Sequence, residues 1–246
     1  VLGCAFHADA TITFGFCKRG LVMYPGADYT GEVRIANVGI GPESFCGQSP
    51  EMYTYEGNER HLPDRITSGN KGTFGKALLV AGSNGMAGAA ILAARAAYRT
   101  GAGMVKVITA EENRQILQQG IPEALYGSWR QLSESLEWAD VIAIGPGIGK
   151  EEQALECLKK VVRKSRKPLV LDADALNLLA EKNGKPLAEE LRTQGAEGRV
   201  IILTPHVGEL SRLLEHSIPE CKQALPACTR VLAERFHGVA VAKDAR

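Results

Sequence analysis

Residues 77–98 read ALLVAGSNGMAGAAILAARAAY, and they carry the clearest indication of the fold class. Its first five residues, Ala77–Ala81, form a continuous apolar run, which is typical of a parallel strand buried on both faces. Gly82-Ser-Asn-Gly85 marks a turn, and the run from Met86 to Tyr98 is rich in alanine and other good helix formers. The stretch therefore predicts a strand, a glycine-rich turn and a helix, which is the repeating unit of α/β sheets.

The same alternation continues toward the C-terminus. Short apolar runs predict strands at residues 104–108, 141–144, 169–171, 200–203 and 239–242. Helices are expected near residues 151–165, 175–181, 208–214 and 221–236. Strands that alternate with helices indicate an α/β fold, with a mostly parallel sheet, right-handed crossovers and helices on both faces.

The N-terminal part of the chain has a different pattern. Residues 1–46 carry two short apolar runs, 11–14 and 32–35, between glycines and prolines, and they are too few to build a core alone. Residues 47–70 are polar and lack periodicity, which indicates a linker. We therefore predict a domain remnant at 1–46, a linker at 47–70 and an α/β domain at 71–246.

Composition excludes several classes of function. The 246 residues carry 29 Lys and Arg against 28 Asp and Glu, so no basic field is available for nucleic acid or an anionic membrane. No apolar run approaches the roughly 18 residues of a membrane span, and the N-terminus lacks a secretory signal, so a cytoplasmic protein is expected. The six cysteines contain no C-x-x-C pair, which argues against a zinc or redox motif and favours reduced thiols.

Parallel sheets bind ligands beyond the carboxyl ends of their strands, and four such ends carry distinctive residues. Two are the glycine-rich turns Gly82–Gly85 and Gly145-Pro-Gly-Ile-Gly149. They allow a ligand to lie against bare backbone, and the first opens a helix whose N–H groups suit an anion. Neither matches the G-x-G-x-x-G or P-loop fingerprint, so plain turns remain the alternative interpretation.

The other two strand ends, Asp172-Ala-Asp174 and Thr204-Pro-His-Val-Gly-Glu209, carry ionisable side chains. Asp172 can hold a substrate hydroxyl or a hydrated Mg²⁺, whereas Asp174 can instead be the N-cap of the helix that follows. The proline before His206 favours extended backbone, which would direct the imidazole into the cleft. Glu209 can join a metal or phosphate network, and the alternative is a surface histidine beside a helix-start glutamate. The remaining histidines are expected at the surface.

Taken in order, these motifs resemble the NAD(P)H-hydrate dehydratase family, the C-terminal half of bifunctional NAD(P)H-hydrate repair enzymes. Residues 1–46, notably 8–14 through 31–40, resemble the tail of the Rossmann-like epimerase domain that precedes it in such proteins. The dehydratase resemblance covers about residues 65–246, and the runs that carry it are 71–75, 81–90, 99–106, 145–149, 171–177, 203–209 and 242–246.

The resemblance implies a ribokinase-like fold and a metabolite-repair reaction. Family members use ADP or ATP, with Mg²⁺, to phosphorylate the ring hydroxyl of hydrated NADH or NADPH, after which phosphate leaves and the dihydronicotinamide returns. Such a transfer needs mainly positioning and charge stabilisation. The parent protein would combine this lyase activity with an isomerase activity, that of a K⁺-dependent epimerase. Whether the protein forms a homo-oligomer is left open.

The resemblance also assigns site residues. The residues expected to contact the hydrate are Ala89, Gly147 and His206. Those expected to lie against the nucleotide are Lys243, Asp244, Ala245 and Arg246. At the strand ends, a region that binds phosphate and magnesium is expected at Asp172, Asn177 and Glu209. No individual metal ligands are assigned within it.

One departure from the family pattern concerns the catalytic base. The family's Gly-Ser-Gly-Asp motif, whose Asp acts on the substrate hydroxyl, does not occur in residues 1–246. We therefore expect a chain truncated at both ends, a sheet incomplete at its C-terminus and no hydrate repair by this chain alone. Two alternatives stay open, a ribokinase-like kinase of a small vitamin precursor and a non-catalytic nucleotide-binding remnant.

Overall fold

The computed structural model describes residues 3–55 and 64–244, which form two compact units divided between Arg65 and Ile66. The division falls inside the predicted linker, 47–70, of which residues 56–63 lie outside the described part of the chain. The smaller unit is built on two parallel strands, β1 (Ala10–Phe14) and β2 (Glu32–Ala36), which lie at the two short apolar runs of this part of the sequence. Helix α1 (Arg19–Val22) and the 3₁₀ turn η1 (Gly26–Asp28) connect them, and η2 (Pro42–Phe45) follows.

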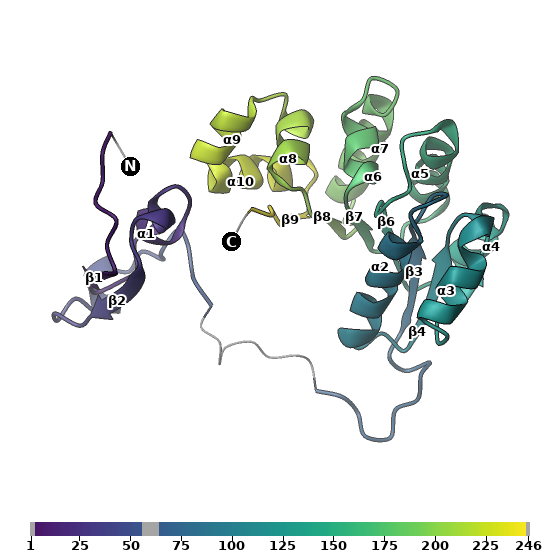
Figure 1. The fold of residues 1–246 in the computed structure, drawn as a ribbon, viewed down its shortest axis with the longest axis horizontal. Helices are drawn as coiled ribbons and strands as arrows, with labels where there is room; N and C mark the ends of the chain where they lie inside the picture. Colours follow the sequence, from purple (N-terminus) through teal and green to yellow (C-terminus); the bar gives the residue numbers. More distant parts are fainter. Residues whose placement is uncertain (1–2, 56–63, 245–246) are drawn as a thin grey trace. The chain divides into compact units, whose positions relative to one another are not determined.

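The larger unit is an α/β domain with a seven-stranded, fully parallel sheet, in the strand order β5-β4-β3-β6-β7-β8-β9 (Figure 1). The strands are β3 (Lys76–Val80), β4 (Met104–Ile108), β5 (Leu125–Gly127), β6 (Val141–Ile144), β7 (Leu169–Leu171), β8 (Ile201–Leu203) and β9 (Val239–Ala240). The helices are α2 (Ala87–Arg99), α3 (Arg114–Gly120), α4 (Leu132–Trp138), α5 (Glu152–Lys164), α6 (Asp174–Ala180), α7 (Lys185–Ala196), α8 (Val207–Leu214), α9 (Ile218–Gln223) and α10 (Leu225–Arg235), with 3₁₀ turns η4 (Glu111–Asn113) and η5 (Trp129–Gln131).

The strand order places a topological switch point between β3 and β6. From β3 the chain moves outward through β4 to β5, and from β6 it moves the opposite way through β7 and β8 to β9. Because parallel crossovers are right-handed, this reversal puts the crossover helices of the two directions on opposite faces of the sheet. Ligands of open α/β sheets bind outside the carboxyl ends of the strands at such a point.

The central strands are buried on both faces, as their apolar runs predict. Leu78 and Val80 of β3, Ile142 of β6 and Leu171 of β7 have no exposed surface, and Leu79, on the other face of β3, is 5% exposed. Apolar side chains on both faces of a strand can be removed from water only if helices cover both faces. The burial therefore agrees with the crossover geometry.

Within its described residues, the larger unit departs from the expected elements in two ways: one predicted helix is divided, and some helices and strands were not predicted. The helix predicted at 221–236 is two helices, α9 and α10, because the chain leaves the helical conformation at Ala224, and Pro226 stands in the first turn of α10. A proline fits the first turn of a helix, where its missing N–H has no partner to lose, but disrupts a helix interior. Four elements had no clear sequence signal, namely α3, β5, α4 and α7.

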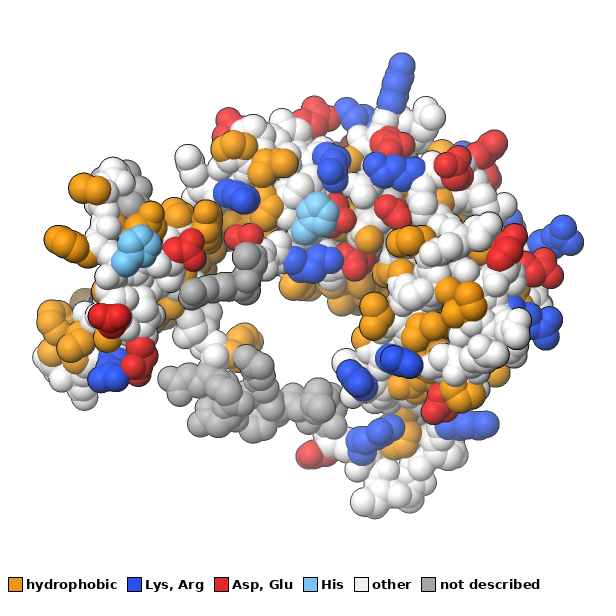
Figure 2. Space-filling model, viewed as in Figure 1, with side chains coloured by type: hydrophobic (Ala, Val, Ile, Leu, Met, Phe, Trp, Pro, Cys, Tyr) orange, Lys and Arg blue, Asp and Glu red, His pale blue; other side chains and the backbone are white. Residues whose placement is uncertain are grey.

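The surface of the larger unit carries both signs of charge. Acidic and basic side chains are interspersed over the face visible in Figure 2. Within the part of the chain that the structure describes, no helix is both long and apolar enough to cross a bilayer.

Candidate functional site

Two glycine-rich loops flank the switch point and are hydrogen-bonded to each other. The amide of Gly82, after β3, donates to the carbonyl of Pro146, after β6, at 2.9 Å. The amide of Ser83 donates to the carbonyl of Gly147 at 2.5 Å. The ends of β3 and β6 therefore form one continuous backbone surface.

Buried polar side chains from the next strand fix the first loop. The hydroxyl of Thr109 and the side-chain amide of Asn113 donate to the carbonyl of Gly82, at 2.6 and 3.1 Å. Both side chains belong to fully or nearly fully buried residues, and Asn113 also donates to the hydroxyl of Thr109 at 3.0 Å. Neither residue was singled out in the sequence. Thr109 could have been, because it is a polar residue directly after an apolar strand.

Two of the predicted substrate residues are neighbours at the switch point. Gly147 has a φ of +63°, and a Cβ on it would lie 2.9 Å from the Cβ of Ala89 in α2. A side chain at this position is disfavoured by the backbone conformation and by the close packing of α2. Gly147 thus has a structural reason to be glycine, whether or not a ligand lies against it. Its substrate contact, and that of Ala89, stay predictions.

The structure changes the interpretation of Asp174. The N-cap of α6 is Ala173, with an unusual φ of +49°, so the suggestion that Asp174 caps this helix is wrong. Its carboxylate instead accepts a hydrogen bond from the amide of Gly149, at 2.9 Å. Asp174 therefore ties the loop after β6 to the start of α6.

Asp172 and Lys243 form an ion pair at the edge of the sheet, although they are 71 residues apart. The ammonium of Lys243 lies 2.5 Å from Oδ1 of Asp172. The side chain of Lys243 is 45% exposed and that of Asp172 is 29% exposed. Asp172 was expected near phosphate or magnesium, and Lys243 was expected near the nucleotide. The fold brings them together because β7 and β9 both flank β8.

The imidazole of His206 caps helix α8. Its Nδ1 accepts from the amides of Gly208 at 2.9 Å and Glu209 at 3.3 Å, while Oε2 of Glu209 accepts from the amide of His206 at 2.9 Å. Nε2 of the ring lies 3.2 Å from Oε1 of Glu209. The Glu209 side chain is 4% exposed, so its carboxylate holds His206, whose side chain is 53% exposed. In the structure Glu209 therefore positions His206. A role for Glu209 in binding phosphate or magnesium stays a prediction.

The predicted substrate and nucleotide residues meet beside β8. His206 and Lys243 form a parallel β-bridge, in which the amide of Lys243 donates to the carbonyl of Pro205 at 2.8 Å. Asp244 is exposed next to this bridge, and Ala245 and Arg246 lie outside the described residues. Asn177 accepts a hydrogen bond from Arg212 of α8 at 2.6 Å. Arg212 was not singled out in the sequence, and no local pattern distinguishes it from other surface arginines.

A cavity of about 470 Å³ opens beside the first glycine-rich loop. Ser83, Asn84 and Ile148 line it together with Glu111 and Arg130, among others. This size lies within the range of small-molecule sites, and the lining combines loop residues with charged side chains. The carboxyl edge of the sheet therefore offers a pocket at one end and an ion pair at the other.

Solved structures with the same fold include known dehydratases. The chain is 31% identical to the ADP/ATP-dependent NAD(P)H-hydrate dehydratase of Bacillus subtilis crystallised with ATP and Mg²⁺, with a TM-score of 0.62 over 74% of this chain and 62% of that one. It is 28% identical to a ribokinase-like superfamily protein of Enterococcus faecalis V583, with a TM-score of 0.63 over 75% of this chain and 63% of that one. The predicted ribokinase-like α/β fold is confirmed.

The sequence comparisons point the same way. Over 247 residues the chain is 38% identical to the bifunctional NAD(P)H-hydrate repair enzyme Nnr of Escherichia coli K12, a match that covers 99% of this chain and 45% of that protein. The chain thus spans about half the length of the curated relatives it matches. The family model described as NAD(P)H-hydrate dehydratase matches residues 77–246, nearly all of the α/β unit. The chain belongs to the NAD(P)H-hydrate dehydratase family.

Proposed function

We propose that this chain supplies the dehydratase part of an NAD(P)H-hydrate repair enzyme that uses ADP or ATP. The observation that carries the proposal is the meeting of His206, Lys243 and Asp172 on one edge of the sheet. His206 belongs to the expected hydrate site and Lys243 to the expected nucleotide site. A phosphoryl group can pass between two ligands only if their sites adjoin, and the contacts of Lys243 with His206 and Asp172 support such an arrangement.

In the proposed reaction the hydroxyl oxygen of the hydrate loses its proton and bonds to the terminal phosphorus of the nucleotide, while the bond from that phosphorus to the bridging oxygen breaks and the shortened nucleotide leaves with the bonding electrons. The C–O bond then breaks, phosphate leaves with the bonding electrons, and a proton is lost from the neighbouring ring carbon. With ATP, the products are NAD(P)H, ADP, phosphate and a proton. Phosphate leaves more readily than hydroxide, and the ring nitrogen donates electrons toward the breaking bond.

The residues at this edge fit a nucleotide carried with Mg²⁺. Mg²⁺ is usually held by one or two carboxylates together with phosphates and waters, and Asp172 offers a partly exposed carboxylate. The bound ion would neutralise phosphate charge. Lys243 adds a positive charge at the same edge, and His206, held by Glu209, presents an exposed ring for hydrate binding.

The smaller unit fits a position at the end of an epimerase domain. The relatives are bifunctional, and the match to the Escherichia coli enzyme covers 99% of this chain, so it includes the two parallel strands. We propose that the whole protein combines K⁺-dependent epimerisation with dehydration in the cytoplasm.

The test is turnover by the whole protein that contains this chain, since the chain alone is expected to lack the catalytic base, with hydrated NADH, Mg²⁺ and either ADP or ATP, measured as recovery of dihydronicotinamide absorbance. The expected result is nucleotide-dependent recovery that falls at least about tenfold in Lys243→Ala and stays unchanged in Lys150→Ala, whose ion pair with Glu181 is also exposed. A stable phosphorylated product without recovery would favour the vitamin-precursor kinase. No turnover by the folded protein with either nucleotide would contradict the proposal.

A further inference from the structure

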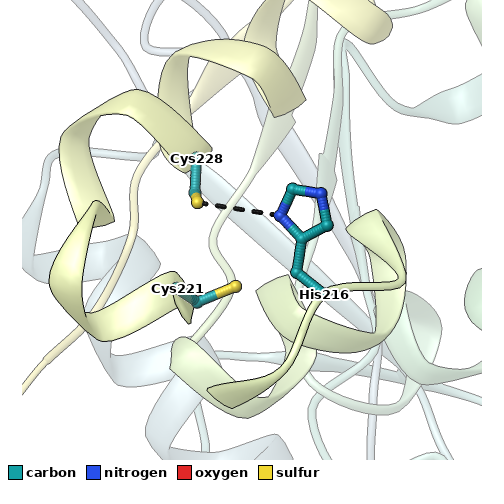
Figure 3. A group of neighbouring side chains, drawn as sticks. All are labelled: His216, Cys221 and Cys228. Carbon is teal, nitrogen blue, oxygen red and sulfur yellow. Dashed lines mark hydrogen bonds between the residues drawn. The ribbon is translucent and has the colours of Figure 1, made fainter. Parts of the chain in front are cut away.

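Three side chains of metal-binding types converge beyond the C-terminal end of α8, the opposite end of this helix from His206. They are His216, in the turn after α8, Cys221 of α9 and Cys228 of α10 (Figure 3). One ligand atom from each lies within 4.8 Å of the other two. His216 is exposed, whereas Cys221 is fully buried and Cys228 is 7% exposed. The spacing H-x₄-C-x₆-C matches no common zinc motif, so the sequence alone argued against a site.

Local structure holds the backbone of each ligand residue. The amide of His216 donates to the carbonyl of Ser211 at 3.1 Å, and its carbonyl accepts from the hydroxyl of Ser211 at 2.7 Å. The amide of Cys221 donates to the carbonyl of Ser217 at 3.1 Å, in a helix that Ser217 also caps. The amide of Cys228 donates to the carbonyl of Ala224 at 2.9 Å, and because all these bonds form without an ion, the backbone of the three ligand residues is held in place before a metal binds.

The spacing of the ligand atoms suits a tetrahedral ion after a small contraction. Zinc binds sulfur at about 2.3 Å and imidazole nitrogen at about 2.0–2.1 Å, so tetrahedral ligands lie roughly 3.6–3.8 Å apart. The sulfur of Cys228 lies 4.0 Å from Nδ1 of His216, and every pair is within 4.8 Å. Each distance therefore has to shorten by no more than about 1 Å, which side-chain rotation can supply.

We propose that His216, Cys221 and Cys228 bind one zinc ion, with water as the fourth ligand. Two sulfurs and one imidazole nitrogen are the ligand types that zinc prefers, and the exposed position of His216 gives a water access to the fourth position. The site would join the end of α8 to α9 and α10. Helix α8 has eight residues, about 12 Å of rise, and His206 caps its other end. The site is thus separate from the proposed reaction and stabilises the packing of α9 and α10 against α8, the helix that His206 caps.

The first test uses Co²⁺ as a spectroscopic probe on the reduced, chelator-treated full chain. We expect one Co²⁺ per chain, with the absorption of tetrahedral thiolate coordination and displacement by Zn²⁺. Cys221→Ser and Cys228→Ser should each abolish the band, and His216→Ala, an exposed position that leaves the core intact, should weaken binding at least tenfold. The matched control is Cys157→Ser, a buried cysteine of α5 outside the cluster, which should keep the band.

The second test is thermal unfolding with and without Zn²⁺. A metal that binds only the folded state raises the melting temperature, so Zn²⁺ should stabilise the wild type and Cys157→Ser but not His216→Ala. Three results would overturn the proposal: no thiolate–cobalt band in the folded wild type, a band that survives Cys221→Ser, or a Cys221–Cys228 disulfide that forms in air and leaves Zn²⁺ without effect. Each readout is independent of hydrate turnover, so failure here is distinct from failure of the proposed function.

Discussion

The carboxyl edge of the sheet is organised differently on its two sides. Around β3 and β6 the contacts are made by the backbone. Glycines at positive φ let the two loops approach each other, and amides of one loop donate hydrogen bonds to carbonyls of the other. Around β7, β8 and β9 it lies in side chains, namely the pairs Asp172–Lys243 and His206–Glu209. Backbone contacts leave no room for a side chain, whereas side-chain pairs can be altered one group at a time. Substitutions should therefore be severe on the first side and graded on the second.

The largest effect is expected at Gly145. Its φ is +136°, and a Cβ would lie 1.7 Å from the carbonyl oxygen of Asp172, so Gly145→Ala must displace the end of β7 or of β6. We expect the free energy of unfolding to fall by at least about 3 kcal/mol, measured by urea denaturation.

The matched control for Gly145 is Gly88→Ala in the first turn of α2. No atom lies within 4 Å of the position that its Cβ would take, and alanine favours helix. This variant should be more stable by about 0.5–1 kcal/mol. Equal stability of Gly145→Ala and the wild type would contradict the distinction between the two sides.

A moderate effect is expected at His206, on the side of the edge around β7, β8 and β9. His206→Ala removes the cap of α8 and should cost about 1 kcal/mol of unfolding free energy. It should also raise the KM for the hydrate more than it lowers kcat, because the ring is expected to bind rather than to transfer a proton. His206→Asn retains a capping oxygen and should restore stability but not KM. A loss of kcat by orders of magnitude at unchanged KM would contradict the binding role.

The smallest effect is expected away from the edge, at the ion pair between Arg163 of α5 and Glu190 of α7. The hydrogen bond from Arg163 lowers the pKa of Glu190 below its ordinary value of 4.5. Any stabilisation is therefore present above that value and is lost as the pH falls through the lowered pKa. Arg163→Ala should lower the melting temperature only slightly at neutral pH, because the pair is exposed, and the difference should vanish in acid. A large difference that persists in acid would show a packing role for Arg163.

The site was harder to predict than the fold for a reason visible in particular residues. The glycine-rich loops and the strand ends at Asp172 and His206 follow from local sequence, because each is a short break in an alternating pattern. The Asp172–Lys243 pair spans 71 residues, and the convergence of His216, Cys221 and Cys228 depends on how three short helices pack. No local pattern encodes such distances.

The sequence by itself determined the strand–helix alternation, the parallel sheet and the family, because these depend on apolar runs, turn glycines and contiguous motifs. Only the tertiary structure shows that Asp174 accepts a hydrogen bond from Gly149, that Gly147 packs against Ala89 of α2, and that Asp172 pairs with Lys243. The physical reason is that secondary structure reflects interactions between near neighbours in the chain. Hydrogen-bond partners and ligand sets depend instead on which strand ends and helices the crossovers bring to the same edge.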